Sequence, residues 1–193
     1  MEPRTTMNVH DYVNGAVATE SKLDEIVANL PVSAVLHFGV AAGELVDMMK
    51  KHVFYKRPLD IAKWNSWIDQ LEYWVKILKH PTDHAFASVK FETDPRLFHA
   101  AVGIFTEGGE LLEALTKSTK KNGEDIDRIN FREEIGDTEW YQAVAYDALQ
   151  VDPEANFWNN HLKLTKDRYK DGFTFEAANN RNLEEERKTL EAI

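Results

Sequence analysis

Two pairs of acidic residues stand out because their spacing could build a metal site. Glu107 and Glu110 are three residues apart, and so are Glu134 and Asp137. Residues three apart on a helix lie on nearly the same face, so each pair would project its carboxylates together. If the two helices pack against each other, the carboxylates converge, and their repulsion is tolerable only where cations neutralise it. Hard oxygen ligands of this kind favour Mg²⁺, with Mn²⁺ as the alternative.

The neighbours of these acids indicate that both pairs face the inside of a helical bundle. Small or apolar residues share their helical faces, namely Gly103, Ala114, Tyr141, Val144, Ala145 and Ala148. Glycine costs roughly 1 kcal/mol of helix propensity relative to alanine. Gly108, Gly109 and Gly136 are therefore explicable where a ligand or another backbone comes close. A di-iron bundle would need two Glu-x-x-His units, which the sequence lacks.

Composition narrows the class of protein. The chain has 193 residues, 43% of them hydrophobic, which suits one domain of residues 1–193 with a substantial core. Its net charge of -10 argues against nucleic acid as a partner, because duplex binding needs a basic face. There is no cysteine, and we find no signal peptide and no run of about 18 apolar residues. We expect a cytoplasmic protein with no membrane partner.

Helical periodicity dominates the sequence and predicts an all-α fold. We expect six helices, over residues 9–29, 34–52, 59–79, 97–118, 129–149 and 153–169. In the third, Trp64, Trp67, Leu71, Trp74 and Leu78 follow spacings of three and four residues, which predicts a buried stripe. We expect residues 80–96 to connect the third and fourth helices, with a short extended segment at 86–91. The turn signal Asn122-Gly123 places a loop at 120–127.

An internal echo suggests a duplicated two-helix unit. His37 and the run from Gly43 resemble His99 and the run from Gly109. We interpret residues 30–80 as a degenerate first repeat, 97–150 as the repeat that carries the metal site, and 151–193 as a C-terminal helix and arm. Chance similarity between two amphipathic helices is the alternative interpretation.

At the acidic pairs the chain resembles the MazG-like all-α nucleoside-triphosphate pyrophosphohydrolases, a family related to the dimeric dUTPases. Their signature is Glu-x-x-Glu, a variable gap and Glu-x-x-Asp, which here reads E-G-G-E and E-I-G-D after 23 intervening residues. Further similarity lies in residues 19–22, 50–60, 160–164, 168–173 and 180–181, so the resemblance covers most of the chain. It departs in the first repeat, where Ala41 stands at the position that matches Glu107.

The resemblance implies a Mg²⁺-dependent enzyme that cleaves a nucleotide between its α- and β-phosphates, giving a monophosphate and pyrophosphate. It implies metal binding by Glu107, Glu110, Glu134 and Asp137. One of these carboxylates could take the proton of the attacking water, and we prefer Glu110 for its central place, with Glu107 as the second candidate. Asn160, Lys163 and Arg168 resemble phosphate contacts. Trp140 and Tyr141 could stack on the base, although aromatic residues at helical spacing more often form core.

Three questions stay open at this level. A dUTPase-type enzyme specific for one base is one alternative to a broader hydrolase. A nucleotide-binding protein without activity is another, because the first repeat is degenerate. The resemblance admits a homo-oligomer, although a first repeat that serves as the packing partner puts that assembly in doubt.

Overall fold

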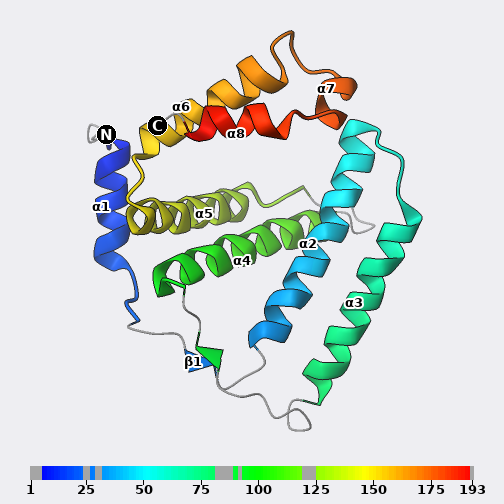
Figure 1. Ribbon diagram of the computed structural model, residues 1–193. Coiled ribbons are helices and arrows are strands. Elements are labelled where there is room, and N and C mark those ends of the chain that lie inside the picture. Colours follow the sequence, from blue (N-terminus) through cyan, green and yellow to red (C-terminus); the bar gives the residue numbers. More distant parts are fainter. Residues whose placement is uncertain are drawn as a thin grey trace. The chain divides into compact units, whose positions relative to one another are not determined.

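The computed structural model describes residues 6–23, 27–28, 32–80, 89–90, 93–118 and 125–191. Helices dominate these residues, so the predicted all-α class is confirmed (Figure 1). The helices are α1 (Val9–Thr19), α2 (Val32–Tyr55), α3 (Ile61–Lys79), α4 (Pro95–Ser118), α5 (Arg128–Leu149), α6 (Pro153–Leu162), the π-helix η1 (Lys163–Arg168), α7 (Phe175–Asn179) and α8 (Leu183–Glu191). Two short strands, β1 (Val27–Ala28) and β2 (Val89–Lys90), pair antiparallel, with Val27 opposite Lys90.

The chain divides into two compact units. The first unit comprises Met1–Ile26 and Phe91–Trp158, and therefore contains α1, α4, α5 and the beginning of α6. The second comprises Val27–Lys90 and Asn159–Ile193, with α2, α3, both strands, η1, α7 and α8. The single domain with two repeats stays a prediction.

Side-chain caps explain where several helices begin. Asp60 accepts a hydrogen bond from the backbone N–H of Lys63 at 2.9 Å, which caps α3. Asp127 accepts from Ile129 at 2.9 Å at the start of α5. Such caps satisfy backbone donors that have no partner inside the helix. Asp152 lies just before α6 and accepts a hydrogen bond from the backbone N–H of Glu154 at 2.8 Å.

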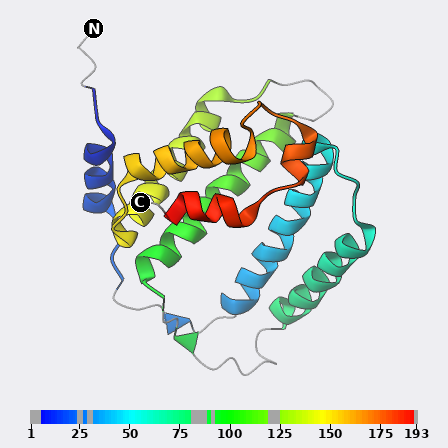
Figure 2. The same ribbon diagram turned by 45° about the horizontal axis from the view of Figure 1, so that its top comes forward.

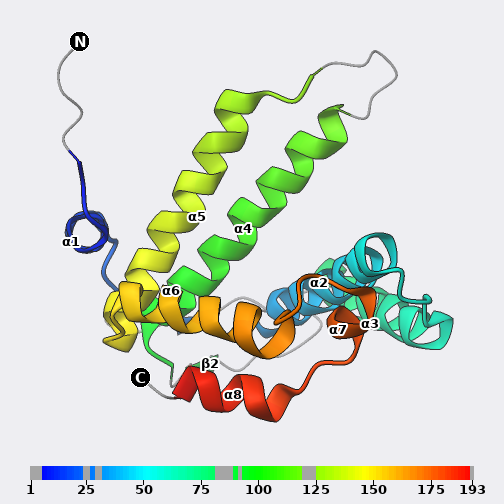
Figure 3. The same cartoon turned by 90° about the horizontal axis from the view of Figure 1, so that it is seen from above.

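In the first unit, α4 and α5 lie side by side as an antiparallel hairpin (Figure 3), and α1 packs on α5. The buried cluster of this unit comprises Val13, Ala16, Ala100, Ala143 and Val144. It takes one or two residues from each of the three helices, and Val144 is fully buried. This core fixes the rotation of α5 about its axis, and thereby decides which of its side chains face α4.

The first helix is shorter than predicted. We expected it to reach residue 29, whereas α1 ends at Thr19 and residues 20–23 are not helical. A contact with a distant residue lies at this end. The carboxylate of Glu20 is held by the guanidinium of Arg96 at 2.9 Å. The Glu20 side chain is fully buried, so a continued helix would break this pair.

The second unit contains the hairpin of α2 and α3, visible in Figure 1. His37 stacks on Trp74 with ring centroids 4.6 Å apart. In the first unit, His99 meets Tyr141 edge-on at 5.4 Å. A histidine of one helix thus contacts an aromatic ring of the next helix in both hairpins. The tryptophan stripe of α3 is half-buried rather than buried, so that prediction was too strong.

Helix α2 is unusually apolar for its exposure. Its length and composition alone would allow α2 to cross a membrane, but core helices of soluble proteins can be equally long and apolar. Glu44 and Asp47 interrupt its apolar run. Val35 and Val53 are 54% and 57% exposed. The expectation of a chain without a membrane partner therefore stays a prediction.

The C-terminal arm departs from the predicted sixth helix. Residues 153–169 were expected to form one α-helix, but α6 ends at Leu162 and a π-helical segment, η1, follows. At the end of η1 a backbone hydrogen bond joins residues five apart instead of four, since the N–H of Tyr169 bonds to the carbonyl of Leu164 at 2.8 Å. After α7 the chain turns back, so that α8 runs alongside η1 (Figure 2).

Candidate metal centre

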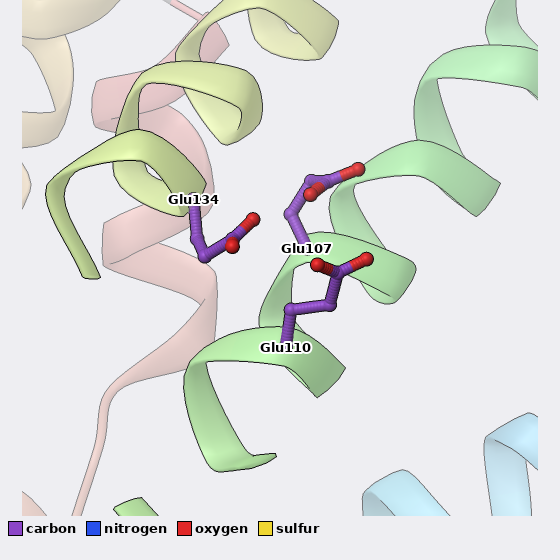
Figure 4. Close-up of side chains that lie close together, drawn as sticks. All are labelled: Glu107, Glu110 and Glu134. Carbon is purple, nitrogen blue, oxygen red and sulfur yellow. The ribbon is translucent and has the colours of Figure 1, made fainter. Parts of the chain in front are cut away.

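Three of the four predicted ligands converge. Glu107 and Glu110 come from α4 and Glu134 from α5, and each offers a carboxylate oxygen within 4.8 Å of the others. Figure 4 shows the carboxylate of Glu134 directed toward α4. Glu134 is buried and Glu110 is exposed. The cluster therefore has one end in the protein interior and one end accessible to solvent.

Asp137 lies beside this cluster rather than in it. With Glu107, Trp140 and Tyr141 it lines a cavity of about 300 Å³. Its exposed side chain sits one turn along α5 from Glu134. The prediction of four converging carboxylates thus holds for three, while Asp137 faces the adjoining cavity together with the two aromatic residues predicted for the base.

The charges of the cluster perturb one another. Burial raises the pKa of Glu134 above its ordinary value, and the neighbouring carboxylate of Glu107 raises it further. The pKa of Tyr141 is also raised, first by burial and then by Glu107 and Asp137. Like charges held close together favour the protonated forms of the carboxylates. A bound cation would reverse this effect on the carboxylates, which makes the cluster a fitting set of ligands for one.

The aromatic side of the site is tied to the core. Trp140 packs against the buried cluster of the first unit, and its indole N–H donates to the hydroxyl of Thr19 at 3.1 Å. The rings of Trp140 and Tyr141 meet at right angles, 5.0 Å apart. Trp140 is therefore both part of the core and part of the cavity wall, and Tyr141 lines the cavity beside it.

The close approach expected at glycine occurs at a different residue. A methyl group on Gly108, Gly109 or Gly136 would meet open space. At Gly103, which is buried, it would overlap the ring of Tyr141. Gly103 therefore makes room for the ring that lines the cavity.

We expect Gly103→Ala to destabilise the protein by about 1–3 kcal/mol, the usual range for overpacking, despite the better helix propensity of alanine. Gly15→Ala in α1, where the added methyl meets nothing within 4 Å, is the control and should be neutral or stabilising. Thermal unfolding compares the two. Equal stability of both variants would show that the Tyr141 ring moves aside without cost.

The sequence interpretation missed Asn130. Its side-chain amide donates to the Oε1 atom of Glu134 at 2.9 Å. Asn130 also lines a second cavity of about 320 Å³, on the other side of the cluster, together with Glu110, Glu134 and Lys117. A spacing of four residues places Asn130 and Glu134 on one helical face, a signal that the sequence contained.

The predicted phosphate contacts belong to the second unit. Asn160 is exposed, and Lys163 and Arg168 are half-buried. The guanidinium of Arg168 is engaged by Glu186, at 2.9 Å from Nε and 2.5 Å from Nη2. Arg168 thus has a carboxylate partner in the position where a phosphate was expected.

The first repeat contains no counterpart of the cluster among its described residues. Ala41 is fully buried in α2, and Glu44 pairs with Lys63 of α3 at 3.3 Å.

Comparison with models of protein families, with curated proteins and with solved structures finds no match for this chain.

Proposed function

We propose that this protein is a Mg²⁺-dependent nucleoside-triphosphate pyrophosphohydrolase, releasing a nucleoside monophosphate and pyrophosphate. The observation that carries the proposal is the convergence of Glu107, Glu110 and Glu134 within 4.8 Å, on two helices of one hairpin. The resemblance of the acidic pairs to the MazG-like signature supports the same reaction.

The donor set fits a small hard cation. Carboxylate oxygens are the ligands that Mg²⁺ prefers, and it is usually bound by one or two carboxylates together with water and substrate phosphates. Glu107, Glu110 and Glu134 would hold the ion, and Asp137 lines the adjoining cavity together with Glu107. Such an ion polarises a phosphoryl oxygen and lowers the pKa of a bound water.

The remaining steps fall to side chains of the first unit. Glu110 is the exposed member of the cluster, so its carboxylate is the best placed to accept the proton of an attacking water. Trp140 and Tyr141 offer ring faces and edges to an aromatic base in the cavity that Glu107 and Asp137 also line. The water would add to the α-phosphorus while the bond to the bridging oxygen breaks, and pyrophosphate leaves.

A panel of the eight common ribo- and deoxyribonucleoside triphosphates, assayed for pyrophosphate release with Mg²⁺, tests the proposal. We expect turnover of at least one, with monophosphate and pyrophosphate formed in equal amounts. Release of inorganic phosphate alone, or no turnover with millimolar Mg²⁺ or Mn²⁺, would reject it. A strong preference for dUTP would identify the base-specific alternative.

Divalent cations should also stabilise the first unit in the absence of substrate. A ligand that binds only the native state at a hundred times its Kd adds about 2.7 kcal/mol, which for a protein of this size is roughly 5–10 °C in melting temperature. Differential scanning calorimetry with MgCl₂ or MnCl₂, against KCl of equal ionic strength, measures the shift. If the divalent salts and KCl gave the same melting temperature, the cluster would not be a metal site.

A further inference from the structure

Asn130 is an uncharged residue beside the cluster, and its side chain contacts one of the cluster's carboxylates. Asn130 and Glu134 are one turn apart in α5, and the Asn130 amide lies 2.9 Å from Oε1 of Glu134. The backbone N–H of Asn130 is itself bound by the capping carboxylate of Asp127 at 3.2 Å. The first turn of α5 is thus fixed at its start, and Asn130 extends that order to the buried carboxylate.

An amide in this place has a specific consequence for the carboxylate. Asn130 can donate to Glu134 without adding a charge. The hydrogen bond engages Oε1 of Glu134 and fixes the plane of a carboxylate that Figure 4 shows directed toward α4.

We propose that Asn130 is a positioning residue of the metal centre, which orients Glu134 for binding a divalent cation. The inference rests on the proposed function, because it presupposes that the cluster binds a metal ion. Outer-shell partners of this kind orient the direct ligands, and their loss typically lowers metal affinity by 10- to 100-fold. Asparagine is also a poorer helix former than leucine, so a helix-stabilising role would not favour it here.

The test is Mn²⁺ binding to the full chain without nucleotide, measured by electron paramagnetic resonance and titration calorimetry. Asn130→Leu keeps a similar size but removes the donor, and we expect it to weaken Mn²⁺ binding by about tenfold or more. Asn130→Gln retains the amide on a longer side chain and should recover most of the affinity. Thermal unfolding of the metal-free Asn130→Leu protein, measured on the same preparation, separates loss of metal affinity from loss of fold.

Asn156→Leu is the matched control. Asn156 also lies in the first unit and donates its amide to the hydroxyl of Tyr146 at 3.2 Å, but it does not contact the cluster. It should leave Mn²⁺ affinity unchanged. If wild type binds Mn²⁺ and Asn130→Leu binds it equally well, the positioning role is wrong while the metal centre stands. If wild type binds no Mn²⁺, the proposed function itself fails and the positioning role falls with it.

Discussion

Neutralising Glu110 or Glu134 should lower kcat by about a hundredfold or more, because mutating an outer-shell partner alone can cost 10- to 100-fold and these residues would bind the ion directly. Glutamine is the substitution of choice, since it keeps the shape of the side chain and removes the charge. The metal-free protein should keep or gain stability, because each substitution relieves repulsion within the cluster. Activity and thermal unfolding, measured on the same preparations, separate loss of chemistry from loss of fold.

Glu133→Gln provides the control for this experiment. Glu133 precedes Glu134 in α5 but is exposed and lies outside the cluster. It should change kcat little, although it removes the same charge one residue away. Full activity of Glu134→Gln would exclude Glu134 from the site, and a comparable loss in Glu133→Gln would point to the overall negative field of α5 instead of direct coordination.

Local signals were sufficient to predict the helices that carry this site. The predicted bounds of 97–118 and 129–149 differ from those of α4 and α5 by no more than two residues. Both starts are marked in the sequence by an aspartate and, at α4, by Pro95, whose missing N–H costs nothing in the first turn. Hydrophobic periodicity then gave the inward faces, including the face shared by Glu134 and Tyr141.

The predictions that were wrong concerned features that depend on contacts between residues far apart in the chain. The end of α1 is set by the pair of Glu20 with Arg96, which are 76 residues apart, so no local pattern could place it. Similarly, the displacement of Asp137 follows from how α5 is rotated by its packing on α1, where the hydroxyl of Tyr12 donates to the carbonyl of Gly136 at 3.2 Å. Helical spacing gives two residues nearly the same direction but does not decide which one meets the neighbouring helix.

The role of glycine shows the same division. Sequence can say that a glycine in a helix has a cost, but the reason depends on what lies opposite. At Gly103 the reason is the ring of Tyr141. A methyl group on Gly109 would meet no atom within 4 Å. Gly109 lies next to Glu110 of the cluster, whose proposed ligand is a metal-bound nucleotide.

The C-terminal arm depends on a buried carboxylate. Glu186 is 4% exposed, and the guanidinium groups of Arg168 and Arg181 contact it at 2.5 and 2.7 Å. These partners, Arg168 first, lower the pKa of Glu186 from 4.5 to about 2. Since one pKa unit corresponds to about 1.4 kcal/mol, this lowering corresponds to about 3 kcal/mol of pH-dependent stability at neutral pH.

Glu186→Gln should therefore release α8 from η1, with a loss of about 3 kcal/mol in the local free energy of opening. The sign of the pH dependence follows from the lowered pKa: the stabilisation is present above the unfolded value near 4.5 and is lost as pH falls toward about 2. Hydrogen exchange of residues 183–191 measures both effects, and in Glu186→Gln this acid-dependent part should be absent. Exchange resolves the arm by itself, which a global melt of two units would not.

Glu184→Gln is the matched control, because Glu184 lies on the same helix, pairs with Lys188 at 2.9 Å and is 81% exposed at its side chain. An exposed pair of this kind contributes little, so exchange should barely change. The comparison also decides between two roles for Arg168. If α8 is protected from hydrogen exchange equally in the Glu186→Gln and Glu184→Gln proteins, the Glu186 carboxylate does not hold the arm. Arg168 is then free for the phosphate contact that the resemblance implies. If Glu186→Gln alone exposes α8, Arg168 serves the arm, and a phosphate could bind it only in competition with Glu186.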